Sequence, residues 1–79
     1  MPRVTVELQI IIYRRYSDQA ERPAWHAELL INGLCVREVC RRKDDDEAYT
    51  ACVEYCTRHK IDTCVIKRDE HWWRRNYGR

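Results

Sequence analysis

Two adjacent residues, Asn32 and Gly33, constrain the fold of this chain more than any other feature of its sequence. Both tolerate the positive φ values that a two-residue type I′ turn requires, and apolar-rich runs flank them on either side. The run before the turn, residues 25–31, has an apolar face that carries Trp25, Ala27, Leu29 and Ile31. The run after it, residues 34–41, alternates less clearly, so we expect both of its faces to be partly covered. The sequence therefore predicts a β-hairpin with one strand on each side of the turn.

A run that alternates more regularly precedes this hairpin. Apolar and polar residues alternate from Val4 to Ile10, and residues 11–13 continue as an unbroken apolar stretch. We expect a long first strand with a bend or bulge where the alternation stops, followed by a polar connecting loop over residues 14–24. One face of the strand should be buried, and it carries Val4, Val6, Leu8, Ile10 and Ile12.

The residues after the hairpin have the signals of an amphipathic helix. Asp44 is a suitable N-cap, and Glu47 three positions later completes a capping box. Asp45 and Asp46 favour the positive end of the helix dipole. The pattern predicts about four turns. The side of this helix that faces the sheet should carry Ala48, Cys52, Tyr55, Cys56 and His59.

A short final strand over residues 63–67 completes the predicted order β-β-β-α-β. We expect one α+β domain over residues 1–79, an antiparallel meander with one helix packed on one face. Residues 71–79 form an aromatic and basic C-terminal segment, in which a fifth, edge strand is possible. An exposed final strand would allow a homodimer through the edge of the sheet.

Charge and cysteine content exclude several classes. The chain has 15 basic and 13 acidic residues and a net charge of +2, which is too near balance to indicate nucleic-acid binding by itself. No apolar run approaches the roughly 20 residues that span a bilayer. The five cysteines are an odd number, and residues 1–3 lead directly into strand-like sequence without a signal peptide. We therefore expect a cytoplasmic protein, in the host cytosol if it is phage-encoded, with reduced thiols that fill the core.

One cluster on the predicted helix has metal-ligand chemistry. Cys52, Cys56 and His59 project within about 60° of one another, and Cys64 or Cys35 is a candidate fourth ligand. Their spacing matches none of the common zinc motifs, and the same side chains are expected to face the sheet. We favour core packing and expect no metal or cofactor, with a zinc- or cysteine-dependent site as the alternative. The chain also has no glycine-rich phosphate loop and no catalytic signature, so we do not expect an enzyme.

The C-terminal segment carries the strongest candidates for partner binding. Tryptophan, tyrosine and arginine dominate binding hot spots because they bury much area and keep polar groups available. The contact residues that we predict are Trp72, Trp73, Arg74, Arg75 and Tyr77, followed by Arg41, Arg42 and Lys43. The segment has three interpretations: a protein contact, a nucleic-acid contact in which the rings stack on bases, or a cap on the core.

In size and in its order of elements, the chain resembles the small anti-CRISPR proteins encoded by phages and mobile elements, although it shares no motif with them. The resemblance implies a stoichiometric inhibitor that binds a CRISPR effector complex. The β-β-β-α order, with Asp46-Glu47-Ala48 at the helix start, also resembles HicB-type antitoxins, from which the arginine-rich tail differs. We therefore expect a non-enzymatic binding protein that inhibits a nucleic-acid-handling complex. The alternatives are a nucleic-acid-binding module and a HicB-like antitoxin domain.

Overall fold

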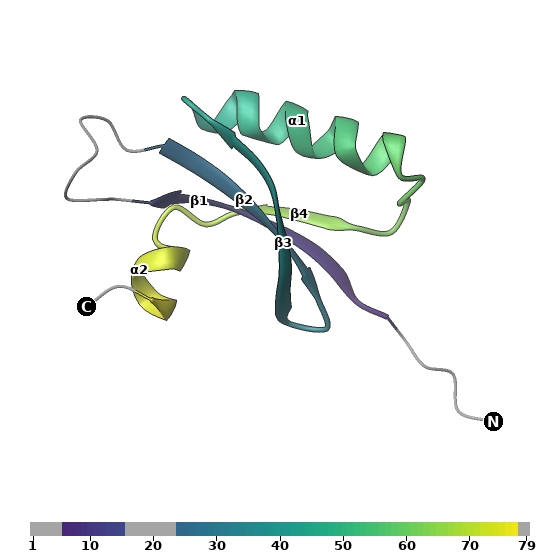
Figure 1. The fold of residues 1–79 in the computed structure, drawn as a ribbon, viewed down its shortest axis with the longest axis horizontal. Coiled ribbons are helices and arrows are strands. Elements are labelled where there is room, and N and C mark those ends of the chain that lie inside the picture. Colours follow the sequence, from purple (N-terminus) through teal and green to yellow (C-terminus); the bar gives the residue numbers. More distant parts are fainter. Residues whose placement is uncertain (1–5, 16–23, 78–79) are drawn as a thin grey trace.

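The computed structural model describes residues 6–15 and 24–77 and contains a four-stranded sheet with a helix on each of its faces (Figure 1). The predicted element order β-β-β-α-β and the packing of one helix against the sheet are confirmed. Val4 and most of the predicted loop over residues 14–24 lie outside the described residues. The elements are β1 (Leu8–Arg15), β2 (Ala24–Ile31), β3 (Leu34–Arg42), α1 (Asp45–Arg58), β4 (Val65–Arg68) and α2 (Trp72–Asn76).

The strands are ordered β3-β2-β1-β4, and the first three form the predicted antiparallel meander. The hairpin turn is confirmed, since Asn32 and Gly33 have φ values of 51° and 82°. The sheet as a whole is mixed, because β4 pairs with β1 in parallel. The connection through α1 crosses the sheet and returns the chain to the end from which β3 started, so β4 runs in the same direction as β3 and β1.

Helix α1 covers one face of the sheet, which we call the α1 face. Its N-cap is confirmed, because the Asp44 side chain accepts a hydrogen bond from the Glu47 backbone N–H at 2.8 Å. His59 is exposed at the C-cap, so its expected place on the buried side is wrong. The buried residues of this core are Ile10, Ile12, Ala27, Leu29, Cys40, Ala48, Cys52 and Cys56.

The predicted buried face of the first strand extends too far toward the N-terminus. Val6 is 55% exposed, because pairing with β2 begins only at Leu8 and Val6 lies before it. The expected bulge in this strand is also wrong, since the register of β1 with β2 is continuous. Irregular pairing occurs in β3 instead, at two shifts relative to β2.

The unbroken apolar stretch of β1 is explained by burial on both faces. Ile10 and Ile12 point toward α1, whereas Ile11 and Tyr13 are buried on the opposite face beneath α2. We call this second face the α2 face. The fifth strand considered for the C-terminal segment does not form among the described residues, because residues 72–76 are helical. Within the described part of the chain, neither helix is long and apolar enough to cross a membrane.

Candidate interaction surface

Helix α2 is held against the sheet by backbone hydrogen bonds to β1. The N–H of Asp69 donates to Ile12 O at 2.8 Å, and the N–H of Arg14 donates to Glu70 O at 3.1 Å. These two bonds continue the pairing of β4 with β1 to the start of the helix. The Asp69 carboxylate also accepts a hydrogen bond from Arg75. The helix therefore begins at a fixed point although no side chain caps its N-terminus.

The aromatic residues of α2 form one cluster with Tyr13. Trp72 and Trp73 are half-buried and pack against the buried residues Ile11, Tyr13 and Leu30. The Tyr13 ring centroid lies 4.9 Å from that of Trp72 and 5.8 Å from that of Trp73. The predicted core-capping interpretation of the tail is therefore correct in part, because both indoles contact the core and neither is fully enclosed.

Two further side chains, Arg15 and Tyr77, extend this cluster toward solvent. The Arg15 guanidinium lies over the Trp73 ring, 4.1 Å from its centroid, which is a close cation–π contact. The Tyr77 ring lies 4.6 Å from Trp73 and is 56% exposed. Its hydroxyl is 3.8 Å from the Cys35 thiol on the edge strand β3. The cluster thus reaches from α2 across the sheet to β3.

A polar network lies beside the aromatic cluster on the same face. The Tyr13 hydroxyl donates a hydrogen bond to Glu28 Oε1 at 3.0 Å, although the Tyr13 side chain is fully buried. Burial and the neighbouring Glu28 carboxylate raise the pKa of Tyr13 well above its usual range. His26 stacks on Tyr13 at 5.7 Å, and its Nδ1 lies 2.6 Å from Glu38 Oε1. The carboxylates of Glu28 and Glu38 therefore lie on the same face of the sheet as the Arg15 guanidinium.

The predicted basic contacts are distributed unequally. Arg74 is exposed and has no ion pair among residues 6–15 and 24–77, whereas Arg75 is paired with Asp69. The triplet Arg41, Arg42 and Lys43 is exposed but does not form one patch. In the pairing of β3 with β2, Arg41 lies opposite His26, so its side chain belongs to the α2 face. Arg42 lies opposite Trp25, which is on the α1 face.

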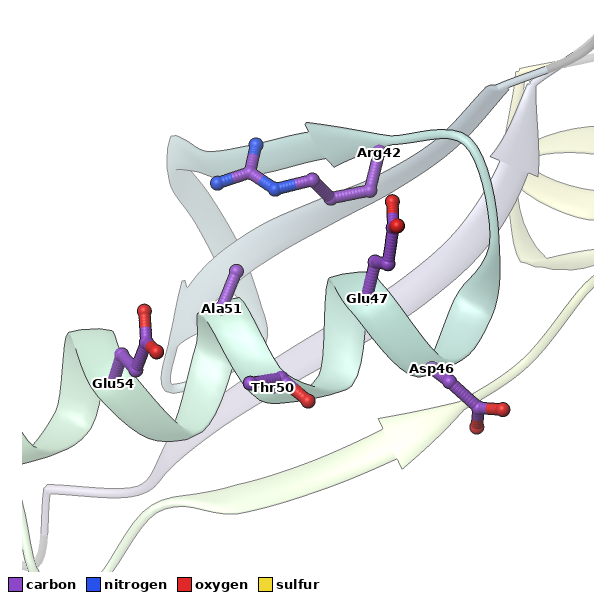
Figure 2. A pocket seen from close by; sticks show the side chains of 6 residues that line it. All are labelled: Arg42, Asp46, Glu47, Thr50, Ala51 and Glu54. Atoms are coloured by element: carbon purple, nitrogen blue, oxygen red, sulfur yellow. The ribbon is translucent and has the colours of Figure 1, made fainter.

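Arg42 lines a different feature, an open groove between the end of β3 and the outer side of α1 (Figure 2). Figure 2 shows Glu47 rising from the helix toward β3, with Asp46 directed away from Arg42. The groove has a volume of about 510 Å³ and mixes one guanidinium with three carboxylates. Two of the acidic residues, Asp46 and Glu47, lie in the first turn of α1, where they are favoured by the dipole, and Glu54 lies further along the helix. The lining residues are Arg42, Asp46, Glu47, Thr50, Ala51 and Glu54.

The predicted metal-ligand candidates are not brought together as a site. Cys52 and Cys56 belong to the core beneath α1, and Cys64 packs against it. The exposed His59 instead packs its ring on Tyr55, with centroids 4.3 Å apart. No three potential ligands converge on one point in the part of the chain that the structure describes.

Sequence reasoning missed the half of the α2 face that comes from the sheet. Tyr13, Arg15, His26 and Glu28 all contribute to it, and none was among the predicted contacts. The unbroken apolar stretch of residues 11–13 was the available signal, because a strand that is apolar on both faces needs a second covering element.

Comparison of the chain with protein-family models, with curated proteins and with solved structures finds no match.

Proposed function

We propose that this chain is a small non-enzymatic binding protein that covers a surface of a protein partner, and that it does so with the α2 face. The observation that carries the proposal is that the aromatic residues of the C-terminal segment are fixed in place and yet partly exposed to solvent. Trp72 and Trp73 are anchored on Tyr13 but remain half-exposed, and Tyr77 is 56% exposed beside them. Aromatic rings that are already fixed lose little conformational freedom on binding, so such a cluster is well suited to act as an interface anchor.

The composition of this face favours a protein partner over nucleic acid. Single-stranded nucleic acid needs open ring faces on which bases stack, together with a continuous positive groove. One side of the Trp73 ring is covered by Arg15 at 4.1 Å, and Tyr13 packs nearly parallel to it. The carboxylates of Glu28 and Glu38 are bound to Tyr13 and His26 on the same face, and they would repel phosphates. A mixed-charge aromatic face instead matches a protein interface with a polar rim.

The partner that we propose is a nucleic-acid-handling complex, with a CRISPR effector complex as the first candidate. The support is architectural: a small β-β-β-α-β domain resembles the anti-CRISPR inhibitors. An edge-strand homodimer has less support. The outer strand β4 has only four residues, and β3 carries two register shifts, both of which reduce edge-to-edge pairing.

The proposal is tested with two variants that make the same charge change on opposite faces. Arg74→Glu alters the α2 face at an exposed position, and Arg37→Glu alters β3 at a position paired with Leu29 on the α1 face. Each protein is titrated into purified CRISPR effector complexes, and DNA cleavage is measured. We expect Arg74→Glu to weaken inhibition about tenfold, because the contact lies at an interface hot spot, and Arg37→Glu to leave it unchanged. Equal inhibition by both variants would remove the α2 face from the proposal, and no inhibition by the wild type would remove the CRISPR partner.

A salt titration separates this function from direct nucleic-acid binding. The measurement is the fluorescence anisotropy of labelled single- and double-stranded DNA with the wild-type protein at low salt. We expect no saturable binding. An affinity that falls steeply with salt concentration would instead show that phosphates are the target and would overturn the protein-partner proposal.

A further inference from the structure

Four of the five cysteines gather where α1 meets the sheet. Cys40, Cys52 and Cys56 are buried members of the core on the α1 face, Cys64 packs against it, and all are free thiols. They come from different elements: Cys40 from β3, Cys52 and Cys56 from successive turns of α1, and Cys64 from the residue before β4. The two helix thiols therefore lie between the thiol of β3 and the thiol that precedes β4. Among the described residues, no three histidine, cysteine, aspartate or glutamate side chains converge as a metal site.

The Cys40 and Cys52 thiols meet at one point of this interface. Cys40 Sγ lies 3.7 Å from the carbonyl oxygen of Ala48. Ala48 is one helical turn before Cys52, and helical side chains lean toward the N-terminus, over the preceding turn. The Cys52 side chain therefore extends toward the position of Cys40 Sγ. Each of the two thiols changes the acidity of the other at this point.

The two members of this pair differ in acidity. The hydrogen bond from Cys52 and, less strongly, the charge of Arg42 lower the pKa of Cys40 to about 7, against the opposing effect of burial. The same hydrogen bond, followed by burial, raises the pKa of Cys52. A thiolate is the form of cysteine that attacks a disulfide, so near neutral pH the pair contains an attacking sulfur beside a resolving thiol.

We propose that Cys40 and Cys52 are a redox-active dithiol that a small disulfide, such as oxidised glutathione, converts into a covalent link between β3 and α1. The Cys40 thiolate attacks one sulfur of oxidised glutathione, whose S–S bond breaks and releases a glutathione thiolate. Cys52, which has no exposure to solvent, then attacks the Cys40 sulfur, and its proton passes to the second glutathione thiolate as that group leaves. Two protein thiols are oxidised to one disulfide, and one oxidised glutathione is reduced to two thiols. The link ties the first half of α1 to the edge strand.

The second pair of thiols provides a matched control. Burial, followed by the charge and the hydrogen bond of Cys56, raises the pKa of Cys64 to about 11. Cys64 is more accessible than Cys40, since it is only half-buried, but it is mostly protonated at neutral pH. If accessibility governed the reaction, Cys56 and Cys64 would be oxidised first. If the paired thiolate governs it, Cys40 and Cys52 are oxidised first.

The experiment compares two variants of the full chain, each with one thiol pair. One carries Cys35→Ser, Cys56→Ala and Cys64→Ser, and the other carries Cys35→Ser, Cys40→Ala and Cys52→Ala. Both are incubated with oxidised glutathione at neutral pH without denaturant, alkylated with iodoacetamide and weighed by mass spectrometry. We expect the Cys40–Cys52 protein to lose two hydrogen atoms and to resist alkylation. Its disulfide should form about tenfold faster than that of the control. Its Tm should rise by about 10 °C and fall again with dithiothreitol.

Results that overturn the proposal are equally definite. They are a folded Cys40–Cys52 protein that stays reduced, one that stops at the mixed disulfide with glutathione, or a control that reacts as fast. Wild-type protein gives an answer that does not depend on how the variants fold. Cleavage after basic residues and after glutamate places each cysteine on its own peptide, because Glu54 separates Cys52 from Cys56. A linked Cys40–Cys52 peptide supports the proposal, and a dominant Cys56–Cys64 peptide contradicts it.

Discussion

The sheet has two covered faces, and they are covered by different means. On the α1 face, a helix of 14 residues lies over aliphatic side chains and thiols that are almost completely buried. On the α2 face, a helix of five residues lies over one isoleucine, one leucine and one tyrosine, and none of its own residues is buried. The first face is closed by apolar packing, whereas the second combines half-exposed indoles with hydrogen-bonded carboxylates. We infer that the first face supplies most of the stability and that the second is the one left available for a partner.

Alanine substitutions at neighbouring positions of β1 test this division directly. Ile12 is fully buried under α1, and Ile11 is buried under α2. We expect Ile12→Ala to lower the free energy of unfolding by about 4 kcal/mol, near the upper part of the range for buried isoleucine. Ile11→Ala should cost about 2 kcal/mol, because the short α2 helix can move inward and fill part of the cavity. The measurement is urea unfolding of both variants, and equal losses would contradict the division.

Local signals in the sequence were sufficient for the parts of the fold that depend on neighbouring residues. Asn32 and Gly33 specify their turn through their own backbone preferences, and Asp44 caps α1 through a residue three positions away. The parallel pairing of β4 could not be predicted in this way. It depends on how α1 crosses the sheet, which joins Gln9 to Val65 over a long stretch of chain.

The candidate site shows the same limit more strongly. Residues 72–76 have no side-chain N-cap and too few turns to be a stable helix alone, so their helix depends on packing against Ile11 and Tyr13. Sequence reasoning found the three aromatic residues of the tail, which do lie together. It treated Arg74 and Arg75 as equivalent, although a tertiary contact with Asp69 engages only Arg75. Strand alternation likewise separates Arg41 from Arg42, a division that follows only once the strand is known to continue to Arg42.

The tyrosine at the centre of the α2 face provides a second, pH-dependent test. Tyr13→Phe removes the hydroxyl that donates to Glu28, and we expect a loss of about 1 kcal/mol at neutral pH. Because the pKa of Tyr13 is raised in the folded state, its contribution is fully present below the usual tyrosine pKa and is lost as the pH rises above it. Between pH 10 and 11, the wild type should lose stability relative to Tyr13→Phe by up to about 1.4 kcal/mol per pH unit.

This pH dependence is measured as the difference between two urea-unfolding series, one for each protein. Other groups that titrate in alkali contribute equally to both series and cancel in the difference. A constant difference across the alkaline range would mean that the Tyr13 hydroxyl is not sequestered. It would place the ring nearer to solvent than the contacts with Trp72 and Trp73 imply.

The smallest expected effect concerns the independence of α2 from the rest of the domain. The Nδ2 group of the Asn76 side chain donates a hydrogen bond to Trp72 O at 2.8 Å, an exposed contact within the helix. Asn76→Ala should change the free energy of global unfolding by less than about 0.5 kcal/mol. It should nevertheless speed hydrogen exchange at the Tyr77 amide, which donates to Trp73 O, while the amides of β1 remain as protected as before. Faster exchange confined to α2 means that this helix opens separately and that the half-exposed indoles can adjust to a partner without disturbing the α1 face. Faster exchange in both elements would show that the two faces open as one unit, and the distinction between a stabilising face and a binding face would then fail.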